Sequence, residues 1–419
     1  MDIFNTYNLI IEACVIIILS FFFSEIAKKT NVPSVLLLIA LGMILKVVME
    51  SFGISNFDFK QILEVLGTIG LIMIVLEAAL ELELKPEKLM PIGVSFAVAL
   101  IGLLVSTATV AWILMYYFPA FTLHKAWLYA TPLSILSSAI IIPSVGSLVA
   151  KKKEFHVYES TFSDIIGIML FYFLAAKYES GNHLTMAGYS LNILITIVLS
   201  LVLSYGILLV FQNIKSSVKL FLLISVLILI YAIGKKMHLS SLIIILIFGL
   251  MIANVGLFFR GELAKWLKVE KAKDIYDGLH VITLETAFVV RTFFFVIFGI
   301  TISLSALTNL YVVGIAALIL LSIYVIRLIL LRAFIGDNVV PQVFIAPRGL
   351  ITVLLFYQIP VEGQLAGFEP GILMLIIIGS SLIMTGGMIF DHQRSNRTIN
   401  KVKSDSVETT EWKAPSYDD

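Results

Sequence analysis

The chain has 419 residues, of which 59% are hydrophobic and 14% charged, and its mean hydropathy is +1.02. Soluble proteins carry about 25% charged residues, so this composition excludes an ordinary water-soluble enzyme. A net charge of +1 gives no electrostatic reason to expect a nucleic acid as partner. The lone cysteine, Cys14, excludes an internal disulfide and a cysteine-based metal site. The composition therefore indicates a polytopic membrane protein in contact with a lipid bilayer.

The apolar residues form long continuous runs, which are typical of membrane-spanning helices and not of barrel strands. We predict an all-α membrane protein with a transmembrane domain over residues 1–391 and about thirteen spans. The predicted spans are 7–26, 33–50, 61–81, 91–118, 124–149, 156–177, 185–212, 219–235, 239–258, 275–303, 310–332, 339–358 and 370–390.

Lys and Arg residues are unevenly distributed between the two sides of these spans. If the N-terminus lies outside, the inside segments hold 20 of them and the outside loops hold 5. Cytoplasmic loops carry the excess of Lys and Arg, so we predict an outside N-terminus and a cytoplasmic C-terminus, in the plasma membrane.

Two polar segments lie on the predicted cytoplasmic side. The segment 260–274 is basic and amphipathic, so it is either an interfacial helix or a solvated linker. The tail 392–419 is polar and rich in Ser and Thr, so we expect it to be disordered.

Ionisable residues within spans are costly and are functional candidates by default. The sixth span contains two of them, Glu159 and Asp164, with Ser163 between them. Glu159 and Ser163 are four residues apart and share a helix face, whereas Asp164 lies about 100° further round. One carboxylate is therefore free to form a structural ion pair while the other binds ions. A carboxylate beside a hydroxyl suits a small hard cation, and a proton competes for the same group. The other candidates are Glu12, Glu77, Glu285, Arg291, Arg327 and Arg348.

The fifth and twelfth spans contain helix-breaking residues. The fifth includes Pro132 and Pro143, with the hydroxyl residues Thr131, Ser134, Ser137 and Ser138 beside or between them. The twelfth includes the stretch 341–349, with two prolines and a glycine. If spans 2–6 and 9–13 form two inverted five-helix repeats, these interruptions occupy corresponding positions. Paired interrupted helices beside an intramembrane Asp predict an ion site near the middle of the membrane.

Three stretches resemble the monovalent cation:proton antiporters, the sodium/proton exchanger superfamily, over residues 5–390. The stretch 76–85 is similar to the family's Gly-Leu-Glu-Leu-x-Leu-Lys segment, with Ala79 in place of the glycine. The stretch 291–299 is similar to its Phe-Phe-x-x-x-Gly span. Residues 159–164 have the Glu-x-x-x-Asn-Asp spacing of the electroneutral exchangers, with Ser163 in place of the Asn.

The resemblance implies a role for several residues. Asp164 matches the ion-binding aspartate, and Glu159 matches the glutamate that pairs with an arginine, here Arg327. Arg348 matches the arginine within the broken helix and sets the local field there. We expect oxygen atoms of the hydroxyl residues Ser163, Ser137, Ser138 and Thr131, together with unwound carbonyls, to complete the shell around Na⁺ or K⁺.

The resemblance also implies the transport mode: one-for-one exchange of a monovalent cation, Na⁺ first, for H⁺, serving pH homeostasis. It implies a homodimer whose mobile core moves against a scaffold, with no cofactor beyond the transported ions. The chain departs from the family because the first interrupted helix contains no carboxylate. This departure leaves K⁺/H⁺ exchange open as an alternative.

Two further alternatives differ in class. A symporter or anion carrier would share the broken-helix architecture but would need a more basic site. An intramembrane enzyme would need a pair of membrane Asp residues or a His-Glu-x-x-His motif. Asp164 is the only Asp predicted deep in a span, and no His has such neighbours, so we do not expect an enzyme.

Overall fold

The computed structural model describes ten stretches of the chain, and every structural statement below concerns these residues. They are 6–30, 33–51, 60–84, 86–179, 186–215, 218–237, 241–259, 268–301, 309–365 and 368–407. Within these stretches the chain is helical and contains no strand.

Each predicted span contains at least one helix of the described residues. Eight are long and apolar enough to cross a membrane by length and composition, with α5 and α6 taken together, and Ala13–Ala27 and Ser241–Ala253 are shorter apolar helices. The helices are α1 (Thr6–Thr30), α2 (Ser34–Ser51), α3 (Lys60–Glu81), α4 (Leu89–Tyr117), α5 (Leu123–Ser134), α6 (Ser138–Ser144), α7 (Ala150–Glu179), α8 (Met186–Phe211), α9 (Lys219–Lys236), α10 (Ser241–Ala253), α11 (Val255–Phe258), α12 (Val269–Thr301), α14 (Leu310–Ile335), α15 (Leu350–Tyr357) and α16 (Gly371–Val407).

The helices pack in two groups that meet around α7. In one group, α4 packs against α5, α7 and α14, and α14 packs against α16. In the other, α12 packs along α2 and α3, and α10 packs against α3, α8 and α9. Contacts between α7 and α3 join the groups, so the residues of α7 lie at the boundary between them.

Three predicted spans are interrupted. The span 124–149 divides into α5 and α6, and its break is not at the prolines, because Ile135 and Ser137 are extended while Pro132 and Pro143 lie within helices. The span 339–358 contains a 3₁₀ turn at Gln342–Phe344, an irregular stretch and the short helix α15. The inverted relation of the two repeats stays a prediction.

The third interruption was not predicted, and it is at Asn254, between α10 and α11. Its side chain donates to the Leu82 carbonyl at 2.8 Å and accepts from the Leu84 N–H at 2.6 Å. Asn254 therefore satisfies backbone groups just beyond the end of α3, where the helix leaves them without partners.

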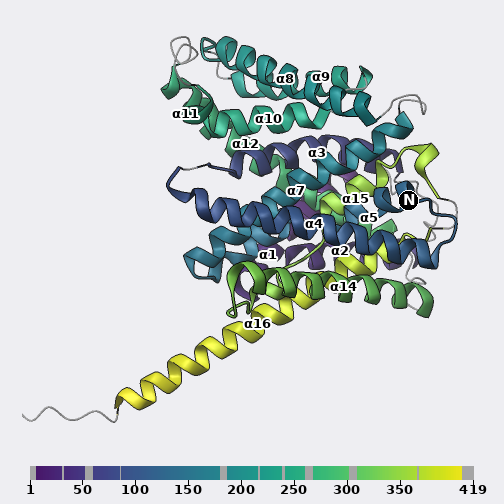
Figure 1. The fold of residues 1–419 in the computed structure, drawn as a ribbon, viewed down its shortest axis with the longest axis vertical. Helices are drawn as coiled ribbons and strands as arrows, with labels where there is room; N and C mark the ends of the chain where they lie inside the picture. The colour runs from purple at the N-terminus through teal and green to yellow at the C-terminus, as the bar shows by residue number, and fades with distance from the viewer. Residues whose placement is uncertain are drawn as a thin grey trace, which may run out of the picture.

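Two predictions for the polar segments need correction. The last helix continues to Val407 and projects from the bundle (Figure 1), so residues 392–407 are helical where we expected disorder. A helix already nucleated in its apolar part adds residues at little cost, even polar ones. From Val269 onward the segment 260–274 is the first part of α12 and not a separate interfacial helix. Residues 260–267 and 408–419 lie outside the described stretches.

The crossing of α2 and α12 depends on two glycines. A Cβ at Gly299 would lie 2.4 Å from the Ile39 carbonyl oxygen, and a Cβ at Gly42 would lie 2.2 Å from the Val296 carbonyl oxygen. Both contacts are with backbone, so no side-chain rotation relieves them. Close helix crossings in membranes use small residues for this reason.

We expect Gly299→Ala to destabilise the protein by about 1–3 kcal/mol, because the two helix backbones must separate. Thermal unfolding in detergent measures the change. Gly314→Ala in α14 is the matched control, since a Cβ there meets nothing within 4 Å. An unchanged stability of the Gly299 variant would show that the crossing tolerates separation.

Candidate functional site

The site is built where the two interrupted spans cross. The Ser137 N–H, at the break between α5 and α6, donates to the Pro347 carbonyl in the second break at 3.0 Å. A Cβ at Gly349 would lie 2.4 Å from Ser137 Oγ, so glycine is needed for this approach. Similarly, a Cβ at Gly167 in α7 would lie 2.3 Å from the Ile135 side chain. The crossing places unwound backbone from both spans next to α7.

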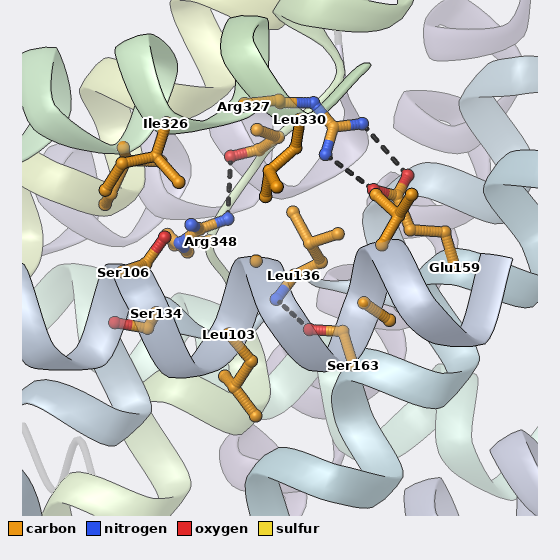
Figure 2. Close-up of a pocket in the computed structure, with 15 residues that line it drawn as sticks. Leu103, Ser106, Ser134, Leu136, Glu159, Ser163, Ile326, Arg327, Leu330 and Arg348 are labelled. Carbon is orange, nitrogen blue, oxygen red and sulfur yellow. Dashed lines mark hydrogen bonds and ion pairs between the residues drawn. The ribbon is translucent and has the colours of Figure 1, made fainter. Parts of the chain in front are cut away.

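Helix α7 presents its two carboxylates to different surroundings, as the helical spacing predicts. Glu159 and Ser163 line a cavity of about 30 Å³ (Figure 2). Asp164 lines a separate, mostly apolar cavity of about 10 Å³ with residues of α3 and α10, including Ala78 and Leu242. The first cavity has room for about one water molecule. Glu159 and Asp164 therefore do not share one compartment.

Asp164 is completely buried and only half satisfied. Its Oδ2 atom accepts from the Ser138 N–H at 3.3 Å, at the start of α6. Its Oδ1 atom is buried and has no hydrogen-bond partner among the described residues, and the same is true of Ser137 Oγ. Buried polar atoms are nearly always paired, so two unpaired oxygen atoms at one break indicate a place for an ion or a proton. Carboxylate and hydroxyl oxygens suit a hard cation.

The other predicted oxygen ligands, Ser163, Ser138 and Thr131, differ in their hydrogen-bond partners. Ser163 Oγ accepts from the Leu136 N–H at 3.0 Å and so holds the unwound stretch in place (Figure 2). The Ser138 contact with Asp164 described above is made by its backbone. The Thr131 hydroxyl donates to the Trp127 carbonyl at 2.8 Å within α5, a partner other than the site. The structure therefore brings Ser138 into contact with Asp164, leaves the neighbouring Ser137 hydroxyl without a partner among the described residues, places Ser163 in support of the break, and gives Thr131 a helix-internal bond.

Glu159 and Arg327 form a buried ion pair with two hydrogen bonds. Arg327 Nη1 lies 2.8 Å from Glu159 Oε1, and Arg327 Nη2 lies 3.0 Å from Glu159 Oε2 (Figure 2). Arg327 Nε also donates to the Gln342 carbonyl at 3.0 Å. The guanidinium thus joins α7 and α14 to the 3₁₀ turn of the second interrupted span. All three hydrogen bonds use the planar geometry that distinguishes Arg from Lys.

His156, which is not among the predicted site residues, belongs to the same cluster. It is completely buried, and its Nδ1 atom lies 3.2 Å from Glu159 Oε2. Its Nε2 atom has no partner among the described residues. The available signal was the spacing of three between His156 and Glu159, which places both on one helix face.

Arg348 balances the backbone dipoles at the crossing. Its buried guanidinium donates through Nε to the Leu133 carbonyl at 2.8 Å and through Nη1 to the Ala346 carbonyl at 3.1 Å. Its backbone N–H donates to Ser380 Oγ at 2.9 Å. Leu133 lies in the last turn of α5, where helix carbonyls lack partners and the dipole favours a cation. Arg348 also borders the 30 Å³ cavity (Figure 2).

A second ion pair, Arg291–Glu77, lies next to α6. Arg291 Nη2 of α12 lies 3.1 Å from Glu77 Oε1 of α3, and Arg291 Nη1 lies 3.5 Å from the Ala139 carbonyl of α6. Among the remaining intramembrane candidates, Glu285 is exposed on the surface of α12, and the side chain of Glu12 lies outside the described residues. No cluster of three or more His, Cys, Asp or Glu that could hold a metal ion occurs within the described stretches.

Comparisons with known proteins give the family and the fold. The family described as "Sodium/hydrogen exchanger, transmembrane" matches residues 15–390. A structure of the sodium proton antiporter MjNhaP1 from Methanocaldococcus jannaschii at pH 8 superposes with a TM-score of 0.66 at 18% identity, covering 93% of this chain and 99% of that one. An electron-microscopy structure of the same antiporter gives a TM-score of 0.65 at 17% identity, covering 98% and 100%.

At these identities the superpositions show the fold alone, and no curated protein matches the chain. The family match covers most of the chain, including both interrupted spans and α7. The chain therefore belongs to the sodium/hydrogen exchanger family.

Proposed function

We propose that this protein exchanges one Na⁺ for one H⁺ at Asp164. The observation that carries the proposal is the buried Asp164 carboxylate, whose Oδ2 atom accepts from the Ser138 N–H and whose Oδ1 atom has no partner among the described residues. A proton or a cation satisfies Oδ1, and the two exclude each other on one carboxylate. This competition couples the opposite movements of the two ions.

The charges around the site support an electroneutral exchange. Glu159 is held by Arg327 through two hydrogen bonds, so it is not available to the ion. Arg327 remains protonated throughout, because arginine does not lose its proton in proteins. Asp164 is then the carboxylate at the crossing that alternately binds a proton and a monovalent cation. Because each carries one positive charge, one exchange cycle moves no net charge.

The choice of Na⁺ rests on the family description and on the superposed sodium proton antiporter. K⁺/H⁺ exchange is the second candidate, because the first interrupted helix contains no carboxylate to strengthen the cation site. A symporter or anion carrier has less support, since the two buried arginines of the site, Arg327 and Arg348, are already occupied by Glu159 and by backbone carbonyls.

We propose that exchange occurs by movement of the group containing α4, α5, α7 and α14 relative to the group containing α2, α3 and α12. Asp164 lies at this boundary, in a cavity that residues of α3 and α10 help to line. Such movement of one bundle past another, around a fixed site, is the usual form of alternating access. The uneven distribution of Lys and Arg supports an outside N-terminus in the plasma membrane. The homodimer is proposed from the resemblance alone.

Proton flux in proteoliposomes containing a pH-sensitive dye tests the proposal. We expect an imposed Na⁺ gradient to drive proton movement at a rate that an imposed membrane potential does not change. Gradients of K⁺ and Li⁺ are compared in the same vesicles. A response to K⁺ alone would show that the transported cation is K⁺ and not Na⁺. A strong dependence of the rate on membrane potential would contradict one-for-one exchange.

A further inference from the structure

A larger cavity reaches α6 next to the break between α5 and α6. Its volume is about 380 Å³, and it lies between α1, α2, α6 and α12. Serine and threonine side chains contribute to its wall, as do residues of α6. Its lining includes Glu25, Ala139, Ser144 and Arg291.

Arg291 connects this cavity to Asp164 through two adjacent residues of α6. Its Nη1 atom lies 3.5 Å from the Ala139 carbonyl, and the N–H of the preceding residue, Ser138, donates to Asp164. The Arg291 side chain retains 18% of its exposure, whereas Asp164 is completely buried. A cation in the cavity therefore meets the charge of Arg291 next to α6, the helix whose Ser138 N–H contacts Asp164.

A positive charge in this place opposes cation transport unless it is neutralised. Glu77, which does not line the cavity, reaches Arg291 from α3 at 3.1 Å and supplies the compensating charge. Glu25 also borders the cavity, but it has an interaction partner of its own. We propose that Glu77 neutralises Arg291, so that this cavity admits a cation to Asp164. The inference rests on the proposed function and assigns Glu77 and Arg291 as positioning residues for it.

The proposal differs from one in which Glu77 itself binds the cation, and a double-mutant comparison separates the two. With neutralisation, Glu77→Gln leaves an unpaired guanidinium beside the path, and removal of that guanidinium reverses the defect. With direct binding, Glu77→Gln removes a ligand, and a second change at Arg291 cannot replace it.

The experiment measures the apparent KM for Na⁺ and the kcat in proteoliposomes at fixed pH, per folded transporter. We expect Glu77→Gln to raise KM on the order of tenfold, as one uncompensated charge near the path would. Arg291→Gln should not raise KM, and the double variant Glu77→Gln/Arg291→Gln should return KM toward that of the parent. The proposal would be overturned if the KM of the double variant were as high as that of Glu77→Gln. It would also be overturned if Glu77→Gln left KM unchanged.

Glu81→Gln is the matched control, because it removes the same charge one turn along α3. Glu81 lies 3.6 Å from His280 and is not the partner of Arg291. We expect its KM to equal that of the parent. A KM for Glu81→Gln as high as that of Glu77→Gln would overturn the assignment to Glu77.

A second variant keeps the test decisive if Glu77→Gln fails to fold. Ser144→Lys adds a positive charge to the cavity wall while the Glu77–Arg291 pair stays intact, and Ser144→Gln adds comparable bulk without charge. We expect Ser144→Lys alone to raise KM. An equal KM in both variants would show that the cation does not pass through this cavity. Exchange that survives in Asp164→Asn would instead overturn the proposed function, so the two failures are distinguishable.

Discussion

Asp164→Asn is expected to abolish cation-driven proton flux while leaving the yield of folded protein unchanged. The substitution preserves the size of the side chain and its ability to accept from the Ser138 N–H, but it removes the negative charge and the site of protonation. Loss of a charged ligand corresponds to roughly 3 kcal/mol, or a decrease in cation affinity of about 100-fold. The loss of the proton site removes the coupling as well.

Flux in proteoliposomes at matched protein amounts measures this effect. Glu285→Gln is the matched control, since it makes the same kind of change within α12 at a side chain on the surface. We expect the control to transport at the parent's rate. Exchange by Asp164→Asn at the parent's level would contradict the assignment of Asp164.

Breaking the Glu159–Arg327 pair should have the second large effect, this time on stability. Either Glu159→Gln or Arg327→Gln leaves the other charge buried, because Glu159 is 1% exposed and Arg327 is 7% exposed. Removing one partner of a buried ion pair costs about 3–5 kcal/mol. We therefore expect a strong decrease in thermal stability in detergent for each single variant.

The double variant Glu159→Gln/Arg327→Met should be more stable than either single variant, since no charge is then left without a partner. Glu154→Gln provides a control at the more exposed Lys88–Glu154 pair, where we expect little or no change. If the single variants unfolded at the parent's temperature, the pair would not hold α7 and α14 together.

The sequence alone specified the helices because the bilayer imposes a simple condition on them. Each span needs about 20 apolar residues, and unpaired backbone groups are excluded from lipid, so continuous apolar runs can only be helices. Each predicted span therefore contains at least one helix of the described stretches. The helical repeat also separates Asp164 from Glu159 and Ser163 without any knowledge of the tertiary structure.

The sequence did not specify where each helix ends or breaks. The break at Asn254 occurs within an apolar run, because its side chain bonds to the backbone beyond α3, a partner 172 residues away in sequence. Likewise α16 continues through polar residues to Val407, where composition alone indicated disorder.

Only the tertiary structure decided which charges meet. Arg291, Arg327 and Arg348 look alike in sequence, yet the first pairs with Glu77, the second with Glu159, and the third with backbone carbonyls. The resemblance indicated the second pair, but no local pattern indicated the first, whose partners are 214 residues apart. The sequence determined where ionisable groups enter the membrane, because burying them is costly wherever they lie. Their partners depend on which helices cross, because a hydrogen bond forms only between atoms within about 3 Å of each other.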